Sequence, residues 1–485
     1  MGINLGVWSL QAGEENAAAI EDASHCCSYK EARIRAMRIA AGLYAAGVRP
    51  GDGVALFLPI SVRATLSIFG IWTAGAAAVP LYYELTNCEI ARYLDLAPVK
   101  WVLTSTCDAD RFADLQGPIQ VLDIEEVEQG GDRFAAPIIS LDTPALTLFT
   151  SGTTGTSKAV IHSAGSVSSQ TIVKEPYRAL TTACSATGVG IIMPVQTLQA
   201  GGTQIVLPSS VKGSQFVKAL LDYRADRARV GPEILMSLIE SGERLDPSVR
   251  LIFGGDFLSA RLQQRSSDVL GCHVMQVYGS TETFSMARGN EETPPGAIGA
   301  TLPQVELQLR SEEDGSVVPG VGQGLAWIRS PKLFMGYGNR GTIERPFDED
   351  GWFKTGDMLR RENDGNYYFL SRATGYLQNN NGKVSPHEIE DALRQEPAVR
   401  NAHATSLRLS GDWDTIVAVL EMEKTDSYIA ARLNSLMDTH VADFRQPEIV
   451  YATHSFPYLP TGKIDARALE TQIRSGSLRQ IIPTS

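Results

Sequence analysis

The chain has 485 residues, of which 43% are hydrophobic and 20% are charged, and this is the composition of an ordinary globular protein. A chain of this length exceeds one usual core, so two or more domains are expected. The formal net charge of −12 argues against general binding to the phosphate backbone of nucleic acids, although a small anion can still bind at a local site.

Cysteine usage and hydropathy indicate the cellular compartment in which the protein is expected. Six cysteines are present, scattered apart from the adjacent Cys26 and Cys27, and no C-x-x-C pair occurs. This spacing argues against a zinc site and favours a reduced, cytoplasmic environment. The first residues lack the basic start and apolar run of a signal peptide, and the apolar stretch 68–81 is too short to span a bilayer. We therefore expect a cytoplasmic protein with no membrane span.

The first 300 residues alternate between helical and strand patterns. Residues 28–49 have the spacing of an amphipathic helix, with Ser28 and Glu31 as a capping box. Short apolar strands follow at 54–59 and 100–105, with helical patterns at 61–76 and 88–98. The alternation continues through 203–208, 214–225 and 249–255. This order predicts α/β layers with mostly parallel sheets.

The pattern changes after about residue 300. Short strands separated by Gly and Asp turns are predicted at 305–311, 324–330 and 366–371. A polar, Asn-rich segment at 371–386 precedes a helix, a strand and a second helix, predicted at 386–395, 415–423 and 427–441. The predicted fold is therefore α/β, with a large N-terminal domain of layered sheets and helices at 1–370. A small α+β C-terminal domain follows at 371–485, with a hinge near 371–375.

The stretch TSGTTGTSK at 150–158 has the chemistry of a phosphate-binding loop. Glycines let backbone N–H groups approach an anion, hydroxyls add donors, and lysine adds charge. A P-loop does not fit, because Ser157 precedes the lysine and Ala159 stands where the magnesium-binding hydroxyl should be. The candidate phosphate ligands are Thr150, Ser151, Gly152, Thr153, Thr154, Gly155 and Lys158.

This stretch resembles the phosphate loop of the adenylate-forming superfamily, which comprises acyl-CoA synthetases, luciferases and peptide-synthetase adenylation domains. Ser157 replaces the usual proline. VYGSTET at 277–283 matches the superfamily's Y-G-x-T-E. The resemblance implies that Tyr278 lies against the adenine ring, that Thr281 bonds a phosphate, and that Glu282 holds Mg²⁺, an ion that prefers carboxylate oxygen.

Further motifs follow in the superfamily's order. LIFGGD at 251–256 resembles the segment whose backbone faces the adenine, which assigns Gly254 and Gly255 to the nucleotide site. WFKTGD at 352–357 implies that Asp357 bonds both ribose hydroxyls, and Arg372 matches an arginine that contacts the nucleotide. LPTGKIDARAL at 459–469 implies that Lys463 bridges the acyl carboxylate and the α-phosphate and stabilises the transition state.

The resemblance covers nearly the whole chain, and it implies a small mobile C-terminal lid and an ATP- and Mg²⁺-dependent ligase. The expected reaction forms an acyl-adenylate of a small organic or aryl carboxylic acid and releases pyrophosphate. The acyl group then passes to CoA, a carrier-protein thiol or an amine, and the sequence leaves these acceptors open. One alternative is adenylation of an unusual acid such as nitrite for N–N bond formation in natural-product biosynthesis. Another is a non-catalytic nucleotide-binding relative, against which Lys463, Glu282 and Asp357 argue.

Two departures from the superfamily pattern bear on the second half-reaction and on the acid. Thr374 replaces the usual hinge carboxylate, Gln378 replaces a lysine, and Asn381 replaces a glycine that lines the passage for a pantetheine arm. These changes leave the CoA-transfer step in question. Residues 191–208 lack the usual His and look shortened. The residues that either line the acid pocket or merely pack there are Val195, Gln196, Thr197 and Gly254.

Overall fold

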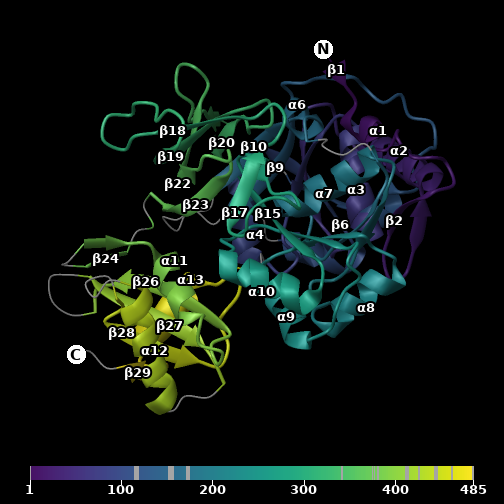
Figure 1. The fold of residues 1–485 in the computed structure, drawn as a ribbon. Coiled ribbons are helices and arrows are strands. Elements are labelled where there is room, and N and C mark those ends of the chain that lie inside the picture. The colour runs from purple at the N-terminus through teal and green to yellow at the C-terminus, as the bar shows by residue number, and fades with distance from the viewer. Residues whose placement is uncertain are drawn as a thin grey trace.

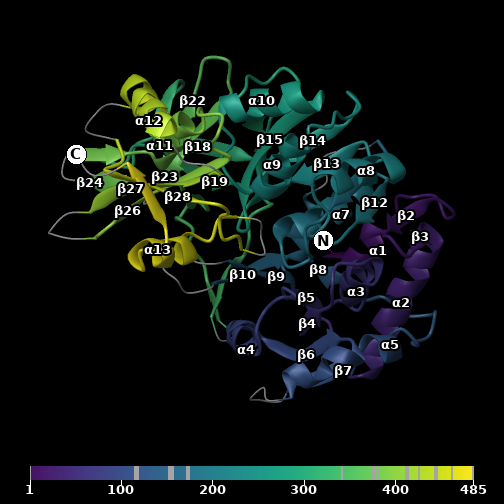
Figure 2. The same ribbon diagram turned by 90° about the horizontal axis from the view of Figure 1, so that it is seen from below.

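The computed structural model describes residues 2–113, 119–150, 158–170, 175–339, 342–373, 375, 377–379, 382–409, 414–423, 427–441, 446–459 and 463–482. It shows the mixed α/β architecture that the sequence predicts. Most elements before residue 373 form one large body, while the elements from α11 (Pro386–Leu393) onward gather in a smaller lobe at one side, as Figures 1 and 2 show. The predicted domain boundary at residue 370 stays a prediction.

The first sheet of the large body has eight described strands in the order β21-β20-β10-β9-β5-β4-β6-β7. Its centre is parallel, since β4 pairs in parallel with both β5 and β6, and β10 pairs antiparallel with β9 and β20. The strands are β4 (Gly53–Phe57), β5 (Ala77–Pro80), β6 (Val99–Thr104), β7 (Gln120–Asp123), β9 (Pro144–Thr150), β10 (Lys158–Ser163), β20 (Gly336–Asn339) and β21 (Thr342–Glu344). The helices that follow its strands are α3 (Val62–Thr73), α4 (Asn87–Leu96) and α5 (Ile124–Val127).

The second sheet has thirteen described strands in the order β18-β19-β22-β23-β17-β16-β15-β14-β13-β11-β12-β2-β3. The run from β15 to β2 is parallel, and the half beyond β15 is antiparallel. The parallel part comprises β2 (Ala18–Glu21), β11 (Arg178–Thr181), β12 (Thr203–Val206), β13 (Arg227–Val230), β14 (Arg250–Phe253) and β15 (His273–Ser280). The antiparallel strands are β3 (Cys26–Ser28), β16 (Phe284–Arg288), β17 (Ala297–Thr301), β18 (Glu306–Arg310), β19 (Gly322–Arg329), β22 (Phe353–Arg361) and β23 (Tyr367–Arg372).

Two large buried clusters flank these sheets, among several smaller ones. Helix α2 (Tyr29–Ala45) packs against α3, and their apolar faces join strands of both sheets and α7 (Gly188–Gln199) in one buried cluster. A second cluster lies under three helices on the outer face of the parallel strands. These helices are α8 (Ser214–Asp222), α9 (Pro232–Ser241) and α10 (Ala260–Leu270). Burial of apolar area at roughly 25 cal/mol per Å² is the main stabilising term in both cores.

The small lobe has its own sheet and its own core. Its four described strands run in the order β26-β27-β28-β29, with bounds Asn401–Leu407, Thr415–Glu421, Ile449–Thr453 and Arg479–Ile482. Helices α11, α12 (Ser427–His440) and α13 (Ala466–Arg474) accompany it, and a separate buried cluster joins α11 and α12 to the sheet. The remaining elements are β1 (Gly2–Ile3), α1 (Leu5–Ser9), the 3-10 helix Thr106–Phe112, β8 (Ile139–Ser140), α6 (Ala164–Ser168), β24 (Leu377–Asn379) and β25 (Gly382–Val384).

One local prediction was half right. Helix α2 begins after Ser28, whose hydroxyl accepts a hydrogen bond from the backbone N–H of Glu31 at 3.2 Å, as an N-cap should. The carboxylate of Glu31 does not complete the capping box; it lies 2.7 Å from Nε2 of His25 and 3.7 Å from a guanidinium nitrogen of Arg35. The side chains of His25 and Arg35 therefore take the place of the N-cap backbone as partners of this carboxylate. Across the described residues, no helix combines the length and the apolar character needed to cross a membrane.

Candidate functional site

Most of the site residues predicted from sequence lie at strand ends in the large body. Gly254 and Gly255 follow the carboxyl end of β14, and Tyr278 stands near the carboxyl end of the neighbouring parallel strand β15. Thr281 and Glu282 occupy the turn between β15 and β16. Ligands of open α/β sheets bind outside the carboxyl ends of their strands, so this edge of the sheet is where a site is expected.

Lys158 and Glu282 are linked through one tyrosine. Thr150 ends β9 and lies directly opposite Lys158 at the start of β10, so the predicted phosphate loop is the connection of a hairpin. The Lys158 ammonium stands 4.4 Å from the ring centroid of Tyr337 on β20, a cation–π distance. The Tyr337 hydroxyl donates to Oε1 of Glu282 at 3.0 Å. The two ends of the hairpin and the Glu282 turn are therefore held in one arrangement.

Asp357 is the buried charge at the centre of the site. Its side chain is 6% exposed, and its Oδ2 accepts a 2.7 Å hydrogen bond from the hydroxyl of Tyr278. Arg372 on β23 lies directly opposite Asp357 on β22, with Nε 2.8 Å from Oδ1. This contact has the distance of an ion pair without the angle of a hydrogen bond, so Oδ1 still has an acceptor position to offer.

The pKa values record how strongly this carboxylate is shielded from water. Burial raises the pKa of Asp357, while Arg372, the Tyr278 hydrogen bond and Lys463 act to lower it and Glu282 adds to the rise. Burial and the nearby Asp357 charge also raise the pKa of Tyr278 well above the usual phenol value, so its hydroxyl keeps its proton. Tyr278 thus remains a hydrogen-bond donor over the physiological pH range.

Lys463 reaches the same site from the small lobe. It precedes α13, and its Cε lies 3.9 Å from the position that a Cβ on Gly255 would occupy. Gly255 has φ of +96°, in the region that only glycine adopts freely, so the residue type and the backbone conformation agree. The lobe therefore places its lysine beside the glycine pair after β14, where the ammonium charge also interacts electrostatically with Asp357.

A buried histidine holds the turn that carries Thr281. His162 on β10 is fully buried, and its Nε2 lies 2.7 Å from the carbonyl oxygen of Thr281. A carbonyl only accepts, so Nε2 donates, and Nδ1 faces the Ser166 hydroxyl at 2.8 Å. The ring stacks on Phe284 at 3.9 Å between centroids. Burial lowers the pKa of His162 to about 3, so the imidazole is neutral and acts as a positioning group.

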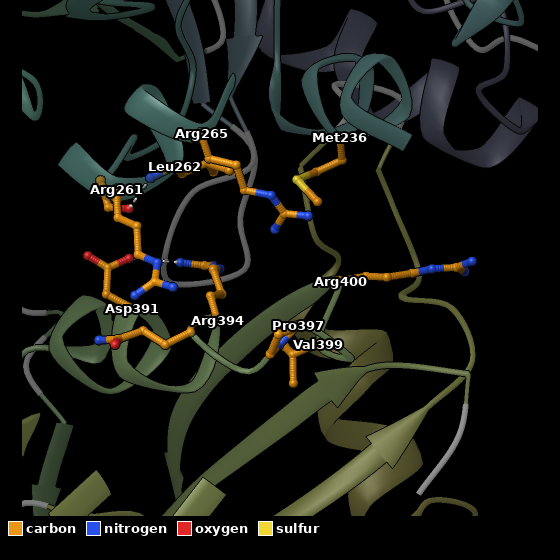
Figure 3. Close-up of a pocket in the computed structure, with 11 residues that line it drawn as sticks. Met236, Arg261, Leu262, Arg265, Asp391, Arg394, Pro397, Val399 and Arg400 are labelled. Atoms are coloured by element: carbon orange, nitrogen blue, oxygen red, sulfur yellow. Dashed lines mark hydrogen bonds and ion pairs between the residues drawn. The ribbon is translucent and has the colours of Figure 1, made fainter. Parts of the chain in front are cut away.

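The lobe and the large body also meet beside the glycine pair. The ring of His387 on α11 stacks on Phe257 at 4.4 Å, and Nε of Arg400 lies 3.4 Å from a carboxylate oxygen of Glu240 on α9. A cavity of about 280 Å³ remains between α9 and α10 on one side and α11 with its following segment on the other (Figure 3). Arg394, which lines this cavity, pairs with Asp391. The cavity is a gap in the interface between the lobe and the large body, and none of the predicted site residues that the structure describes lines it.

The structure brings together most, though not all, of the predicted residues. Thr150, Lys158, Gly254, Gly255, Tyr278, Thr281, Glu282, Asp357, Arg372 and Lys463 lie in the arrangement just described. Ser151, Gly152, Thr153, Thr154 and Gly155 lie outside the described residues, as do Thr374 and Asn381 and the side chain of Gln378. The roles assigned to all of these residues stay predictions.

The residues suggested for the acid pocket have different surroundings in the structure. Val195 packs fully buried in the core around α2 and α3, where its side of α7 faces apolar neighbours, and this position agrees with the second of the two alternatives, a packing residue. The Thr197 hydroxyl donates to Oε1 of buried Gln204 at 3.1 Å, and the Gln196 amide donates to the carbonyl of Gln170. Gly254 has no room for a side chain, because a Cβ there would meet Cγ1 of Val277 at 2.7 Å.

Sequence reasoning missed His162 and Tyr337. His162 lies on β10, the strand that Lys158 begins, and contacts Thr281, whereas Tyr337 reaches Glu282 from the distant strand β20. Neither stands in a spaced motif, and a lone His in an apolar strand is ordinarily a core residue. The roles of both residues become visible only in the folded chain, through the pairing of β10 with β20 for Tyr337 and through the contact with the Thr281 carbonyl for His162.

Comparison with known proteins assigns the family. Residues 8–338 match the sequence profile of a family described as "AMP-binding enzyme". The chain belongs to this family. It is therefore an adenylate-forming enzyme related to peptide-synthetase adenylation domains and acyl-CoA ligases, which bears out the resemblance seen in the sequence.

Two relatives match this chain over most of their own length at low identity. The chain is 27% identical to triostin synthetase I of Streptomyces triostinicus, covering 92% of this chain and 89% of that protein. It is 24% identical to 4-coumarate–CoA ligase-like 6 of Arabidopsis thaliana, covering 91% and 85%. Among solved structures, ATP-bound MatB from Rhodopseudomonas palustris superposes with a TM-score of 0.88 at 24% identity, covering 98% and 99%. At that identity the structural likeness establishes the fold alone.

The neutral state of His162 predicts an acid-sensitive fold. The unfolded chain binds a proton at this residue near pH 6.5, whereas the native state does not until about pH 3. The free energy of unfolding should therefore fall by up to about 1.4 kcal/mol per pH unit over this window. Urea denaturation at several pH values should show a shallower slope for His162→Gln. His454→Gln, at an exposed position, is the control, and equal slopes for all three proteins would contradict the assignment.

Proposed function

We propose that the chain activates a small carboxylic acid with ATP, forms an acyl-adenylate and releases pyrophosphate. The observation that best supports this is the convergence on Asp357: a hydroxyl from β15, a guanidinium from β23 and the lobe's Lys463 all act on one buried carboxylate. A structural ion pair needs no third element from another lobe. A site that is completed only when the lobe lies against it suits a reaction that must exclude water.

The residues of the large body fit a nucleotide. Oδ1 of Asp357 is buried without a hydrogen-bond partner and would accept from ribose hydroxyls, and Gly255 would let the backbone approach a ring closely. Tyr278 would pack against the adenine, Arg372 would contact the nucleotide, and the hairpin from Thr150 to Lys158 would grip the phosphates. The partly exposed Glu282 carboxylate is a suitable oxygen ligand for Mg²⁺, which when bound would neutralise phosphate charge.

The chemical step follows from this arrangement. A carboxylate oxygen of the acid attacks the α-phosphorus of ATP, the new O–P bond forms, and the bond from the α-phosphorus to the bridging oxygen breaks. Pyrophosphate leaves with that electron pair. Lys463 would neutralise charge that builds on the α-phosphate and the attacking acid, and Thr281 would bond a phosphate oxygen. No general base is required, because the acid is already ionised at neutral pH. The acceptor of the acyl group, whether CoA, a carrier-protein thiol or an amine, belongs to a second step.

Removal of the lobe's lysine should abolish most of the first half-reaction. We expect Lys463→Ala to lower acid-dependent pyrophosphate release by roughly 10²–10³-fold, as for loss of one transition-state donor. ATP affinity, measured by calorimetry, should change little, because the large body supplies the other nucleotide contacts. Arg467→Ala, an exposed cation four residues further along, is the matched control. Unchanged release in Lys463→Ala would exclude the proposed role.

Asp357→Asn should act on nucleotide binding. The amide keeps the shape but loses the charge that strengthens hydrogen bonds, which are worth about 1.5–3 kcal/mol each when one partner is ionised. We expect the Kd for ATP to rise at least tenfold. Asp364→Asn, in the exposed turn between β22 and β23, should bind ATP normally. Equal affinities for the two variants would count against a ribose contact at Asp357.

The acid itself is best found directly. Incubation with ATP, Mg²⁺ and a panel of aryl, aliphatic and amino acids, with nitrite included, should give pyrophosphate release for one class and a matching adenylate by mass spectrometry. Nitrite-dependent release without any carboxylic-acid adenylate would favour the N–N-forming alternative. ATP binding without release for any acid would instead favour a non-catalytic relative.

A further inference from the structure

Strand β13 carries two arginines where apolar residues are expected. It lies inside the thirteen-stranded sheet, between β14 and β11, and pairs in parallel with both. Such strands are normally runs of Val, Ile and Leu, because both faces are covered. Here the sequence is Arg227, Ala228, Arg229 and Val230. The two apolar residues point to the core under α8–α10, so both arginines point to the opposite, inner face.

The sheet register places a third cation on the same face. Arg229 lies opposite Ile252 on β14, which lies opposite Met275 on β15. Val277, two residues beyond Met275 and therefore on the same face, lies opposite Arg288 on β16. The inner face of these four strands thus carries Arg227, Arg229 and Arg288.

These charges lack the carboxylates that usually accompany buried cations. Burial and Arg288 lower the pKa of Arg229 to about 10, and burial and Arg227 lower that of Arg288. Burial and Arg288 likewise lower the pKa of Lys332, which is only 2% exposed. Arg227 does have partners: its Cζ lies 4.0 Å from the ring centroid of Tyr177, and its Nε lies 3.8 Å from Oδ1 of Asp226. Within the described part of the chain, Arg229, Arg288 and Lys332 have no ion pair, and Nε of Arg229 is buried without a hydrogen-bond partner.

The position of Arg229 connects this cluster to the proposed site. Its Nη2 lies 3.2 Å from where a Cβ on Gly254 would stand, and the adjacent Gly255 faces Lys463. The guanidinium therefore borders the glycine pair from the sheet's inner face, while Lys463 approaches it from the lobe. A molecule gripped by Lys463 at one end would extend toward Arg229.

We propose that Arg229 and Arg288 bind a carboxylate carried by a small substrate, distinct from the group that is adenylated. A buried cation without a partner is costly, and a planar guanidinium matches a carboxylate in a bidentate geometry. The ligand class is therefore a dicarboxylic acid, or an acceptor molecule that itself bears a carboxylate. This inference rests on the proposed adenylation for the location of the acid.

Paired acids that differ only in the second carboxylate test the inference. Terephthalate against benzoate, and glutarate against butyrate, should differ at least tenfold in kcat/KM for pyrophosphate release, with most of the difference in KM. Arg229→Met should reduce each difference to threefold or less and leave benzoate and butyrate nearly unchanged. Arg229→Lys should retain part of the preference, and Arg224→Met, at an exposed position before β13, should retain all of it. Circular dichroism melts verify that each variant is folded.

A second arm separates the two sources of the carboxylate. With nitrite as the acid, an aminobenzoate that accelerates turnover only while Arg229 is present would assign the site to the acceptor, and aniline is the matched compound without the carboxylate. A preference among the acids themselves would assign it to the adenylated substrate. Either result supports the site.

A binding measurement keeps the inference independent of activity. Terephthalate, glutarate or aminobenzoate should raise the Tm of the wild type but not that of Arg229→Met. Benzoate, butyrate and aniline should leave the Tm of both proteins unchanged. If no acid supports pyrophosphate release while this shift persists, the proposed function fails and the carboxylate site stands. Equal shifts for paired compounds, or a preference that survives in Arg229→Met, would overturn the site.

Discussion

Asp357 has to hold a negative charge in a place that water hardly reaches, and much of the site is arranged around that requirement. Burial raises the pKa of this carboxyl group and so disfavours the charge that the proposed nucleotide contact would need. Tyr278 and Arg372 offset the loss of hydration from two different strands, and Lys463 adds a third positive contribution from the lobe. The order of the second sheet matters here, because it brings β22 and β23 near β15 although about 75 residues separate them in sequence.

Hydrogen bonds and ring contacts from neighbouring side chains hold several of the predicted site residues in position. His162 is neutral because it is buried, and being neutral it donates from one nitrogen and leaves the other as an acceptor, which orients the turn that carries Thr281. Tyr337 likewise positions Glu282 through its hydroxyl and Lys158 through the face of its ring. Aromatic residues at such positions restrict polar side chains to few rotamers, so a ligand would meet groups already in place.

The sequence predicted the fold class and the family because those depend on local signals. Alternating helix and strand patterns, and motifs such as YGSTE and TGD, can be read within a few residues of each other. Supporting residues such as His162 could not be found in this way, since their meaning depends on which strands become neighbours. Val195 was predicted either to line the acid pocket or to pack in the core, a choice that its sequence neighbours could not make, and the helix turns its side chain toward the core. The sequence predicted no strand at β13, and the lack of partners around Arg229 is a property of the folded sheet.

Arg372 is the final residue of β23 and, at the same time, the partner of Asp357. From this point the backbone leaves the sheet and runs toward the lobe. Movement of the lobe, if it occurs as the sequence resemblance implies, would therefore act first on the strand end that carries this guanidinium. Mechanical coupling of this kind would make the departure of the nucleotide and the swing of the lobe two aspects of one event, with no separate relay between them.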